Sequence, residues 1–243
     1  MKKRFAEPWC VLPVADPCKP LPCPALYDMS RPLEVEIGCG KGRFLAGRAA
    51  ENPGVEFLGI ERMLGRVRDF DGKARRLGLA NAHIVRLEAL YTLHYLLPDR
   101  HVRTLYVFFP DPWPKRKHRR HRLFSPLFLD ALHKKLETGG RLQFATDHDA
   151  YFAEACGIMS ADPRFRRVPP MDRSAPERWT EFETLFRGKG MEIHAAAWEA
   201  LPPQDGDPPL EPLRVPESEW PRDRGGAECD PPAGPDAEEA DAG

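Results

Sequence analysis

Residues 33–42 read Leu33-Glu34-Val35-Glu36-Ile37-Gly38-Cys39-Gly40-Lys41-Gly42, and this stretch decides the fold. Its first five residues predict a strand that ends directly in glycines. Glycine permits positive φ and lets a ligand approach the backbone closely. Taken alone, such a loop is either a ligand cradle or a tight turn from a strand into a helix. The stretch therefore predicts a strand, a candidate binding loop and a following helix.

The segments after this loop alternate between helix and strand. Helical spacing predicts helices at residues 43–51, 64–77 and 124–136, the last of them stopped by Gly139-Gly140. Apolar runs predict strands at residues 56–60, 83–87, 102–109 and 141–146. This alternation implies an α/β domain with a parallel sheet covered on both faces, in which ligands bind beyond the carboxyl ends of the strands.

The composition of the 243 residues narrows the class of protein. With 42% hydrophobic and 30% charged residues, the chain suits a soluble globular protein. The longest apolar stretch, residues 102–109, is too short to span a membrane, and no apolar segment of a signal peptide follows Met1-Lys2-Lys3-Arg4. The six cysteines include no CxxC pair, which supports neither a disulfide framework nor a zinc site. We therefore expect a cytoplasmic protein with no membrane partner and no metal.

The formal net charge of −1 is the sum of two oppositely charged parts. Residues 202–243 hold twelve acids, three arginines and ten of the 27 prolines, which leaves residues 1–201 with 33 basic and 25 acidic residues, a charge of +8. Proline-rich acidic sequence buries too little apolar surface to offset its ordering entropy. We therefore expect a loosely structured arm at 1–30, a cationic domain at 31–200, and a disordered tail at 201–243. The acidic tail either aids solubility, which is the favoured role, or competes with an anionic partner for the basic residues Lys115 to Arg122.

Three carboxylates are placed to meet a nucleoside ligand. Glu61 ends the second strand, 23 residues after Gly38, where an acid commonly pairs with ribose hydroxyls. Glu36 would repel a pyrophosphate, whereas it would attract the ammonium and sulfonium of S-adenosylmethionine. Glu88 follows the third strand and is either an adenine contact or an ordinary exposed glutamate. The GxGxG spacing also departs from the GxGxxG of nicotinamide cofactors, so S-adenosylmethionine is the favoured ligand.

A proline-rich turn, Phe108-Phe109-Pro110-Asp111-Pro112-Trp113-Pro114, leaves the fourth strand. Prolines flank Asp111 and restrict its backbone on both sides. An acid and an indole on a stiff turn suit a site where a base stacks on an aromatic ring, unless Trp113 packs into the core. The next eight residues, Lys115 to Arg122, hold six permanent cations and two histidines. This density favours contact with a phosphate backbone over a merely solvated face.

Together these motifs resemble those of the tRNA (guanine-N7)-methyltransferase family. The resemblance runs from Leu33 to about Trp198 and rests on five motifs in the family's order, namely Val35 to Gly42, Gly59-Ile60-Glu61, Phe108 to Lys115 with its basic extension, Ala145-Thr146-Asp147 and Thr180-Glu181-Phe182-Glu183. It implies a Rossmann-like class I methyltransferase fold with a mostly parallel seven-stranded sheet. It also implies a cytoplasmic monomer or homodimer that uses S-adenosylmethionine, without a metal, to methylate N7 of the guanosine at position 46 in the variable loop of tRNA.

The resemblance further implies a role for individual residues. Cofactor contacts are expected from Glu36, Gly38, Gly40, Gly42, Glu61, Glu88 and Asp111. Contacts with guanosine or tRNA are expected from Lys115, Asp147, Thr180, Glu181, Phe182 and Glu183. The RNA backbone is expected to contact Lys117, His118, Arg119, Arg120, His121 and Arg122. The chain departs from the family at Glu88, where Asp or Asn is usual.

Guanine N7 carries a lone pair and no proton, so no general base is needed and positioning dominates the chemistry. A fixed aspartate would stabilise the positive charge that develops on the ring, which makes Asp111 the expected catalytic residue. Asp147 and Glu183 are candidates for hydrogen bonds to guanine N1 and N2. From the residues alone, Asp147 caps a helix that begins near Asp149, and Thr180 with Glu183 forms a capping box.

Three other functions fit parts of the pattern. An adenine-N6 methyltransferase would place two prolines before the aromatic residue, whereas Trp113 separates Pro112 and Pro114. A non-catalytic RNA-binding protein would not need an intact glycine loop together with Glu61 and Asp111. A nicotinamide-dependent oxidoreductase is disfavoured by Glu36 and by the glycine spacing.

Overall fold

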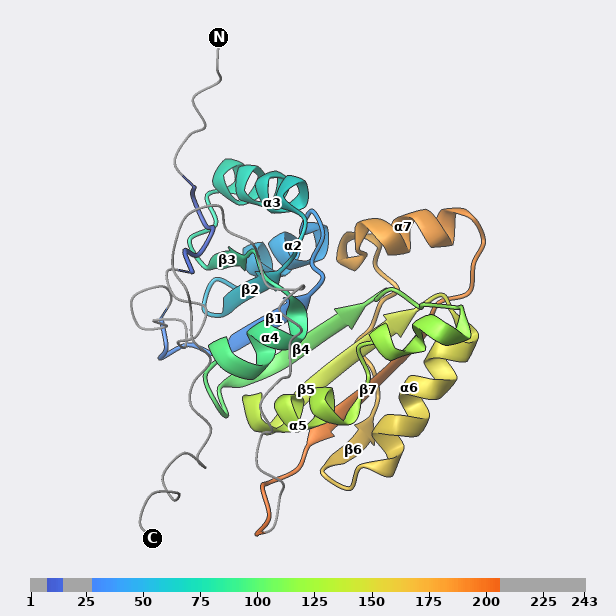
Figure 1. Ribbon diagram of the computed structural model, residues 1–243. Helices are drawn as coiled ribbons and strands as arrows, with labels where there is room; N and C mark the ends of the chain where they lie inside the picture. Colours follow the sequence, from blue (N-terminus) through green and yellow to red (C-terminus); the bar gives the residue numbers. More distant parts are fainter. Residues whose placement is uncertain (1–7, 15–27, 206–243) are drawn as a thin grey trace, which may run out of the picture.

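The computed structural model describes residues 8–14 and 28–205 (Figure 1). Its strands form one seven-stranded sheet made of β1 (Leu33–Ile37), β2 (Glu56–Ile60), β3 (Ala82–Val85), β4 (Val102–Phe108), β5 (Leu136–Thr146), β6 (Phe165–Val168) and β7 (His194–Ala200). The strand order is β3-β2-β1-β4-β5-β7-β6; β1 to β5 pair in parallel, and β7 is antiparallel to both of its neighbours. The prediction of a mostly parallel seven-stranded sheet is confirmed.

Helices cover both faces of this sheet (Figure 1). The helices α2 (Arg43–Glu51) and α3 (Leu64–Leu77) pack on one face through a cluster that includes Leu45 and Phe70. The opposite face is covered by α4 (Ala89–Tyr91) with the π-helical turn Thr92–Leu96, by α5 (Pro126–Lys135) and by α6 (Asp149–Ala161). The helix α7 (Glu181–Gly188) lies near α2 and α3, beyond the end of β4 (Figure 1).

The predicted bounds of β1, α2, β2 and α3 match the structure. The helix predicted at residues 124–136 is observed as α5, Pro126–Lys135, but Gly139-Gly140 does not stop it, because Leu136 already pairs with Val102 in the sheet. The register then shifts before Arg141 pairs with Thr104. A Cβ on Gly140 would lie 2.9 Å from the carbonyl oxygen of Val102, so the glycines serve an irregularity inside β5 rather than a helix end.

The described part of the N-terminal arm, residues 8–14, extends the sheet. Val11 forms a parallel bridge with Ile84 of the edge strand β3. The Asp71 carboxylate on α3 accepts hydrogen bonds from the backbone N–H groups of Trp9, at 2.7 Å, and Cys10, at 2.8 Å. The arm therefore covers an otherwise open sheet edge. The rest of the predicted arm, and nearly all of the predicted acidic tail, lie outside the described residues.

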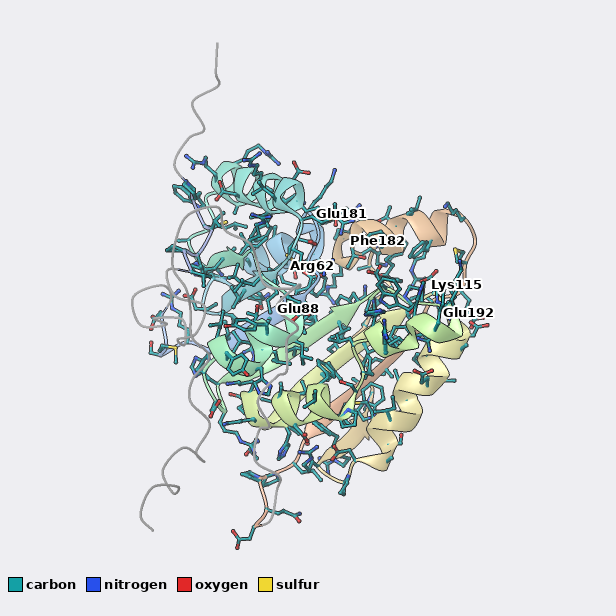
Figure 2. All side chains as sticks on the ribbon, in the orientation of Figure 1. Arg62, Glu88, Lys115, Glu181, Phe182 and Glu192 are labelled. Carbon is teal, nitrogen blue, oxygen red and sulfur yellow. The ribbon has the colours of Figure 1, made fainter. Side chains whose placement is uncertain are left out.

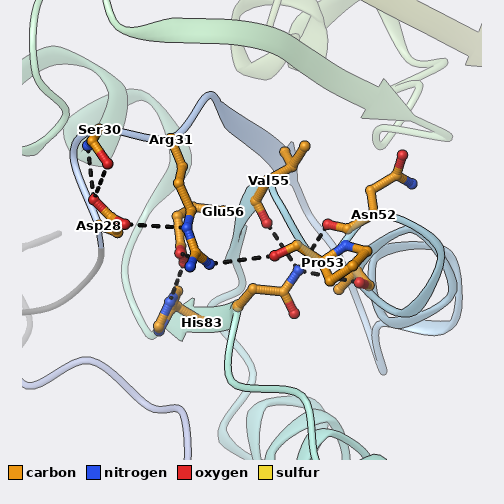
Figure 3. A network of polar contacts seen from close by, with 10 residues as sticks. Asp28, Ser30, Arg31, Asn52, Pro53, Val55, Glu56 and His83 are labelled. Carbon is orange, nitrogen blue, oxygen red and sulfur yellow. Dashed lines mark hydrogen bonds and ion pairs between the residues drawn. The ribbon is translucent and has the colours of Figure 1, made fainter.

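A polar network closes the amino ends of the strands (Figure 3). Glu56, the first residue of β2, is buried and meets Arg31 at 3.3 Å and His83 at 2.9 Å. Arg31 also pairs with Asp28 at 3.1 Å. The Asn81 amide donates to three backbone carbonyls in and after α2, including that of Val55 at 2.9 Å. Because these polar groups form hydrogen bonds and ion pairs with one another, we interpret this end of the sheet as stabilising the fold.

Candidate active site

The glycine loop follows β1 at the point where the strand order reverses, between β1 and β4. Gly38, Gly40 and Gly42 all have positive φ, at 68°, 58° and 65°. The loop is held against β2 because Ile60 O accepts the N–H groups of Gly38 and Cys39 at 2.8 and 3.2 Å. A Cβ on Gly42 would lie 1.9 Å from Phe70 Cδ2, so this position also allows α2 and α3 to pack closely.

Cys39 is a buried packing residue. A Cβ on Gly59 in β2 would lie 2.6 Å from Cys39 Sγ, so the thiol fills the space that this glycine leaves. Burial, reinforced by nearby Glu36, raises the pKa of the Cys39 thiol well above its usual range. The thiol is therefore protonated and inert at neutral pH.

Glu61 joins the loop to the end of β2, as its position after that strand predicts. Its Oε2 accepts the N–H of Gly40 at 3.1 Å, and its Oε1 accepts the N–H of Met63 at 2.8 Å. Arg66 lies 3.5 Å from the same carboxylate. These contacts hold the Glu61 carboxylate against the glycine loop in one orientation.

Two glutamates of β1 point toward α2, and both are buried. Glu34 is fully engaged, because Arg48, Arg103 and the Tyr106 hydroxyl all donate to its carboxylate. Glu36, at 2% exposure, keeps one oxygen, Oε2, without a hydrogen-bond partner among the described residues. Burial, with smaller contributions from Glu181 and Glu61, raises the pKa of the Glu36 carboxyl well above its usual range.

An orphaned buried carboxylate oxygen beside a glycine loop fits a ligand that brings a positive charge. The ammonium and sulfonium groups of S-adenosylmethionine meet that requirement. A pyrophosphate does not, because it would add negative charge next to Glu36 and Glu61. The two carboxylates at the ends of β1 and β2 therefore fit S-adenosylmethionine better than a nicotinamide cofactor.

The turn after β4 places Asp111 across the switch point from the glycine loop, on the exposed surface. Phe109 and Trp113 have positive φ, 53° and 41°, which is strained for residues with large side chains. Arg122 holds this shape by donating from Nε to Pro112 O at 2.8 Å and from Nη2 to Trp113 O at 3.5 Å. Arg122 is only 6% exposed and pairs with Glu154 at 2.5 Å, so its guanidinium is committed to the turn.

Trp113 is half-buried and packs against the basic run rather than in the core. Its ring centroid lies 5.7 Å from that of His118 and 5.1 Å from that of His121. The run itself forms a 3₁₀ helix, Arg116–His121. Lys115, Lys117, Arg120 and His121 are exposed, whereas the side chains of Arg116 and Arg119 lie outside the described part of the chain. The described cations give the turn a positively charged outer surface.

The α7 segment lies over the glycine loop. Arg43, the first residue of α2, donates to Thr184 Oγ1 at 3.1 Å and to Pro176 O at 3.2 Å. Lys73 donates to Lys41 O at 2.8 Å and to Glu181 at 3.4 Å. In Figure 2, Glu181 and Phe182 come from α7 and Lys115 from the turn after β4, at the same end of the molecule. Phe182 is exposed beneath the Arg66 guanidinium, 5.6 Å from its ring centroid.

The predicted capping box at α7 is half right. Thr180 is the N-cap, and its Oγ1 accepts the N–H of Glu183 at 3.0 Å. Glu183 does not return the bond, because its carboxylate is 0% exposed and accepts from Arg173 and Arg187 instead. The Arg187 Nε to Glu183 Oε1 distance is 3.0 Å. Glu183 therefore stabilises α7 and the residues before it through buried ion pairs.

Asp147 does not cap α6, contrary to the prediction. The helix begins at Asp149, so the capping position is His148, whose Nδ1 accepts the N–H of Tyr151 at 3.2 Å. Asp147 is left half-buried at the end of β5, where residues 147–150 line a shallow open hollow. Glu88 has a capping role of its own, since its Oε2 accepts the N–H of Tyr91 at 2.7 Å at the start of α4.

Sequence reasoning missed Arg173, which is buried between α7 and the sheet. Its guanidinium lies 3.9 Å from the centroid of the Phe108 ring. Arg173 sits in an irregular segment between β6 and α7, outside any motif, and its partners are distant in sequence. No local pattern in the chain could have singled it out from the other arginines.

Comparisons with known proteins agree with this geometry. Residues 30–196 match the model of a family described as "Putative methyltransferase". The chain is 34% identical over 179 residues to the tRNA (guanine-N(7)-)-methyltransferase of Chromohalobacter salexigens, covering 73% of each protein. It is 32% identical over 188 residues to the protein of the same name from Halorhodospira halophila, covering 74% of this chain and 80% of the relative.

The crystal structure of the 16S rRNA methyltransferase KamB superposes with a TM-score of 0.55 at 16% identity, covering 73% of this chain and 90% of that one. At this identity the likeness supports the class I methyltransferase fold alone. Within residues 8–14 and 28–205, no helix is long and apolar enough to cross a membrane. The same residues contain no group of three or more His, Cys, Asp or Glu side chains that could hold a metal ion.

Proposed function

The chain belongs to the tRNA (guanine-N7)-methyltransferase family, and we propose that it methylates N7 of the guanosine at position 46 in the variable loop of tRNA, with Asp111 as the catalytic residue. One observation carries the proposal. The orphaned Glu36 carboxylate and the strained Asp111 turn stand at the carboxyl ends of adjacent strands, β1 and β4. A cationic methyl donor on the first and a guanine on the second would meet at the switch point.

S-adenosylmethionine, when bound, supplies an electrophilic methyl group on a sulfonium. Glu36 would take the positive charge of its methionine portion, and Glu61 would take the ribose hydroxyls. The loop glycines 38, 40 and 42 would allow the nucleoside to approach the backbone. Glu88 would face the adenine edge, from the start of α4.

Guanine N7 carries a free lone pair and no proton, so Asp111 is not needed as a general base. The role of this aspartate is electrostatic: it would stabilise the positive charge that moves onto the guanine ring during transfer. Prolines on both sides and Arg122 behind the turn limit its movement, which favours a fixed geometry for in-line displacement. Exposed Asp111 would be desolvated only when tRNA covers it.

The exposed cations beside this turn are suited to the RNA backbone. Lys115, Lys117, Arg120 and His121 project from the 3₁₀ helix and its approach, with His118 half-buried against Trp113. Arg119 belongs to the same proposed surface by its place in the run. Arg122 would act differently, by holding the shape of the turn rather than by touching RNA.

The guanosine pocket would be completed by the ends of β5 and α7. Asp147 and Glu181 are open enough to contact the base, and exposed Phe182 can stack on it. Thr180 and Glu183 would orient these residues from inside, because their side chains are buried and already bonded. We further propose that the protein works in the cytoplasm as a monomer or homodimer.

Transfer of labelled methyl from S-adenosylmethionine to unmodified tRNA tests the proposal. The labelled tRNA is then treated with reagents that cleave the chain at N7-methylguanosine. We expect incorporation and a single cleavage in the variable loop. Label on an adenine would favour methylation of an exocyclic amine, and no label on any tRNA would favour a non-catalytic RNA-binding protein; either result would overturn the proposal.

A further inference from the structure

Two buried charged groups at the carboxyl edge each keep one atom without a hydrogen-bond partner among the described residues. They are Oε2 of Glu36 and Nη1 of Arg173. An unmet hydrogen bond on a buried charged group costs free energy, and native structures leave few of them without a reason. Finding one acidic and one basic group in this condition at the same site points to a ligand that bears both an ammonium and a carboxylate.

The position of Arg173 is defined by the sheet. In register, Glu36 of β1 pairs with Tyr106 of β4, and Phe108 lies two residues further toward the carboxyl end. Side chains two residues apart on a strand share a face. The Arg173 guanidinium stacks on Phe108 at 3.9 Å and lies 5.9 Å from the ring of Phe44 on α2. Arg173 is therefore just beyond Glu36, on the α2 side of the sheet.

Arg173 and Glu36 influence each other but are not paired. The positive charge of Arg173 lowers the pKa of the Glu36 carboxyl, against the larger effect of burial. No ion pair joins them among the described residues, because Arg173 directs Nε and Nη2 to Glu183. The third nitrogen, Nη1, is the one without a partner.

Glu183 also receives Arg187, so two guanidinium groups share one carboxylate. This trio carries a net positive charge at a site where the Arg173 side chain is only 5% exposed. A structural ion pair would be complete with one arginine. A ligand carboxylate would supply a second anion for these two guanidinium groups.

We propose that Arg173 binds the α-carboxylate of the methionine portion of S-adenosylmethionine while Glu36 binds the α-ammonium. The inference rests on the proposed function, because it takes that cofactor as its ligand. Guanidinium–carboxylate and carboxylate–ammonium hydrogen bonds are charge-assisted and strong. Glu183 fixes the Arg173 side chain, so the site needs little reorganisation when the zwitterion arrives.

Both unpartnered atoms are shielded from solvent, so we infer that the ligand reaches them when the segment from Arg173 to Glu183 lifts from the glycine loop. Its links to the loop and to α2 include polar contacts of Arg43 and Lys73. These bonds are individually weak enough to open and close. Adenosylmethionine would then close the segment again by pairing with Arg173.

Calorimetric binding of three ligands to the full chain tests separately the contact of Arg173 with the ligand carboxylate and that of Glu36 with the ligand ammonium. Adenosylhomocysteine has both the carboxylate and the ammonium, its decarboxylated analogue has only the ammonium, and 5′-methylthioadenosine has neither. For Arg173→Met we expect the affinity for adenosylhomocysteine to fall by about tenfold to a hundredfold, with the other two unchanged. For Glu36→Gln we expect weaker binding of the first two ligands and unchanged binding of 5′-methylthioadenosine.

Arg43→Met is the matched control, since Arg43 also holds the segment but its donors already have partners. We expect this variant to change the three affinities by the same factor. If Arg173→Met also lowers the affinity for all three ligands by the same factor, Arg173 only holds the segment in place through its ion pair with Glu183, and the inference is wrong. If the unsubstituted chain fails to bind adenosylhomocysteine at all, it is the proposed function that fails.

Discussion

The two sides of the switch point, where the strand order reverses between β1 and β4, differ in whether their charged residues are buried or exposed. On the cofactor side, after β1 and β2, the carboxylates of Glu36 and Glu61 are buried and the backbone is bent by glycines. On the acceptor side, after β4, Asp111 and Lys115 are exposed and the backbone is stiffened by prolines. A small ligand can be enclosed completely, whereas a tRNA can only be met on an open face. The difference in burial matches the difference in the size of the two ligands.

This contrast has an energetic consequence. Buried charges on the cofactor side act at short range and are little screened by salt, so they select one ligand. Exposed cations on the proposed acceptor side are screened, and their contribution to tRNA binding would come from many weak phosphate contacts. Substitutions on the first side should therefore change the affinity for the cofactor, and substitutions on the second should change the salt dependence of tRNA binding.

The largest effect is expected at Asp111. Asp111→Ala should lower the rate of methyl transfer by about 10²–10³-fold, because the charge that stabilises the guanine cation is lost. The affinity for tRNA should stay largely intact. Single-turnover transfer and filter binding with the same tRNA measure the two quantities. Near-normal turnover would remove Asp111 from the reaction.

The glycine loop offers a matched pair for stability. Gly42→Ala should cost about 3 kcal/mol in the free energy of unfolding, because it adds a clash with Phe70 to the strain of positive φ. Gly38→Ala has the same sign of φ but nothing within 4 Å, so it should cost only about 1 kcal/mol. Urea unfolding compares them. Equal losses would show that backbone strain, and not close packing, sets the requirement at Gly42.

The two glutamates of β1 should respond in opposite directions. Glu34→Gln should destabilise the protein by about 2 kcal/mol, since Arg48 and Arg103 lose their anion. Glu36 has a raised pKa, so its folded form binds a proton more tightly than its unfolded form, and its contribution to stability is lost as pH rises through that pKa. Glu36→Gln should therefore flatten the fall in stability from about pH 4.5 upward, while lowering the affinity for adenosylhomocysteine.

Thermal unfolding of both variants between pH 4 and pH 8, with and without adenosylhomocysteine, checks this pair. A loss of stability at neutral pH for Glu36→Gln like that for Glu34→Gln would mean that Glu36 is structural too.

The smallest effect is expected from the exposed cations. Replacing Lys115, Lys117 and Arg120 together by Gln should weaken tRNA binding by about tenfold and reduce the slope of log affinity against log salt by about 2. The affinity for adenosylhomocysteine should not change. Lys134→Gln, an exposed lysine near the start of β4 on the far end of the molecule, is the control and should leave the slope intact. A normal slope for the triple variant would place the RNA elsewhere.

Much of the cofactor side could be predicted from the sequence, because its signals are local. Three glycines in five residues between an apolar strand and a helix determine the loop, and Glu61 is found by its distance along the chain. The strand Leu33–Ile37 and the helix Leu64–Leu77 were correct to the residue. Near β5 the end of the helix was predicted to within one residue, but its stop signal was wrong, because the pairing of Leu136 with Val102 ends the helix before Gly139-Gly140 is reached.

The acceptor side was less predictable, because its charged residues look alike in sequence. Arg122 belongs to a run of cations, yet its long-range pairing with Glu154 buries it. Arg173, which the proposal places on the cofactor side, was missed for the same reason, because it stands in an irregular segment and becomes notable only when the fold stacks it on Phe108. His148 caps α6 in place of Asp147 because the helix begins at Asp149, which makes His148 the residue directly before it. Such roles depend on tertiary contacts that no short window contains.

The most direct test of the account uses two tRNA transcripts that differ at single atoms. One contains guanosine and the other 7-deazaguanosine, in which carbon replaces N7 while the Watson–Crick edge stays the same. With labelled S-adenosylmethionine, the account predicts methyl incorporation into the first transcript and none into the second, at comparable affinity for both. Equal incorporation into the two transcripts would contradict transfer to guanine N7.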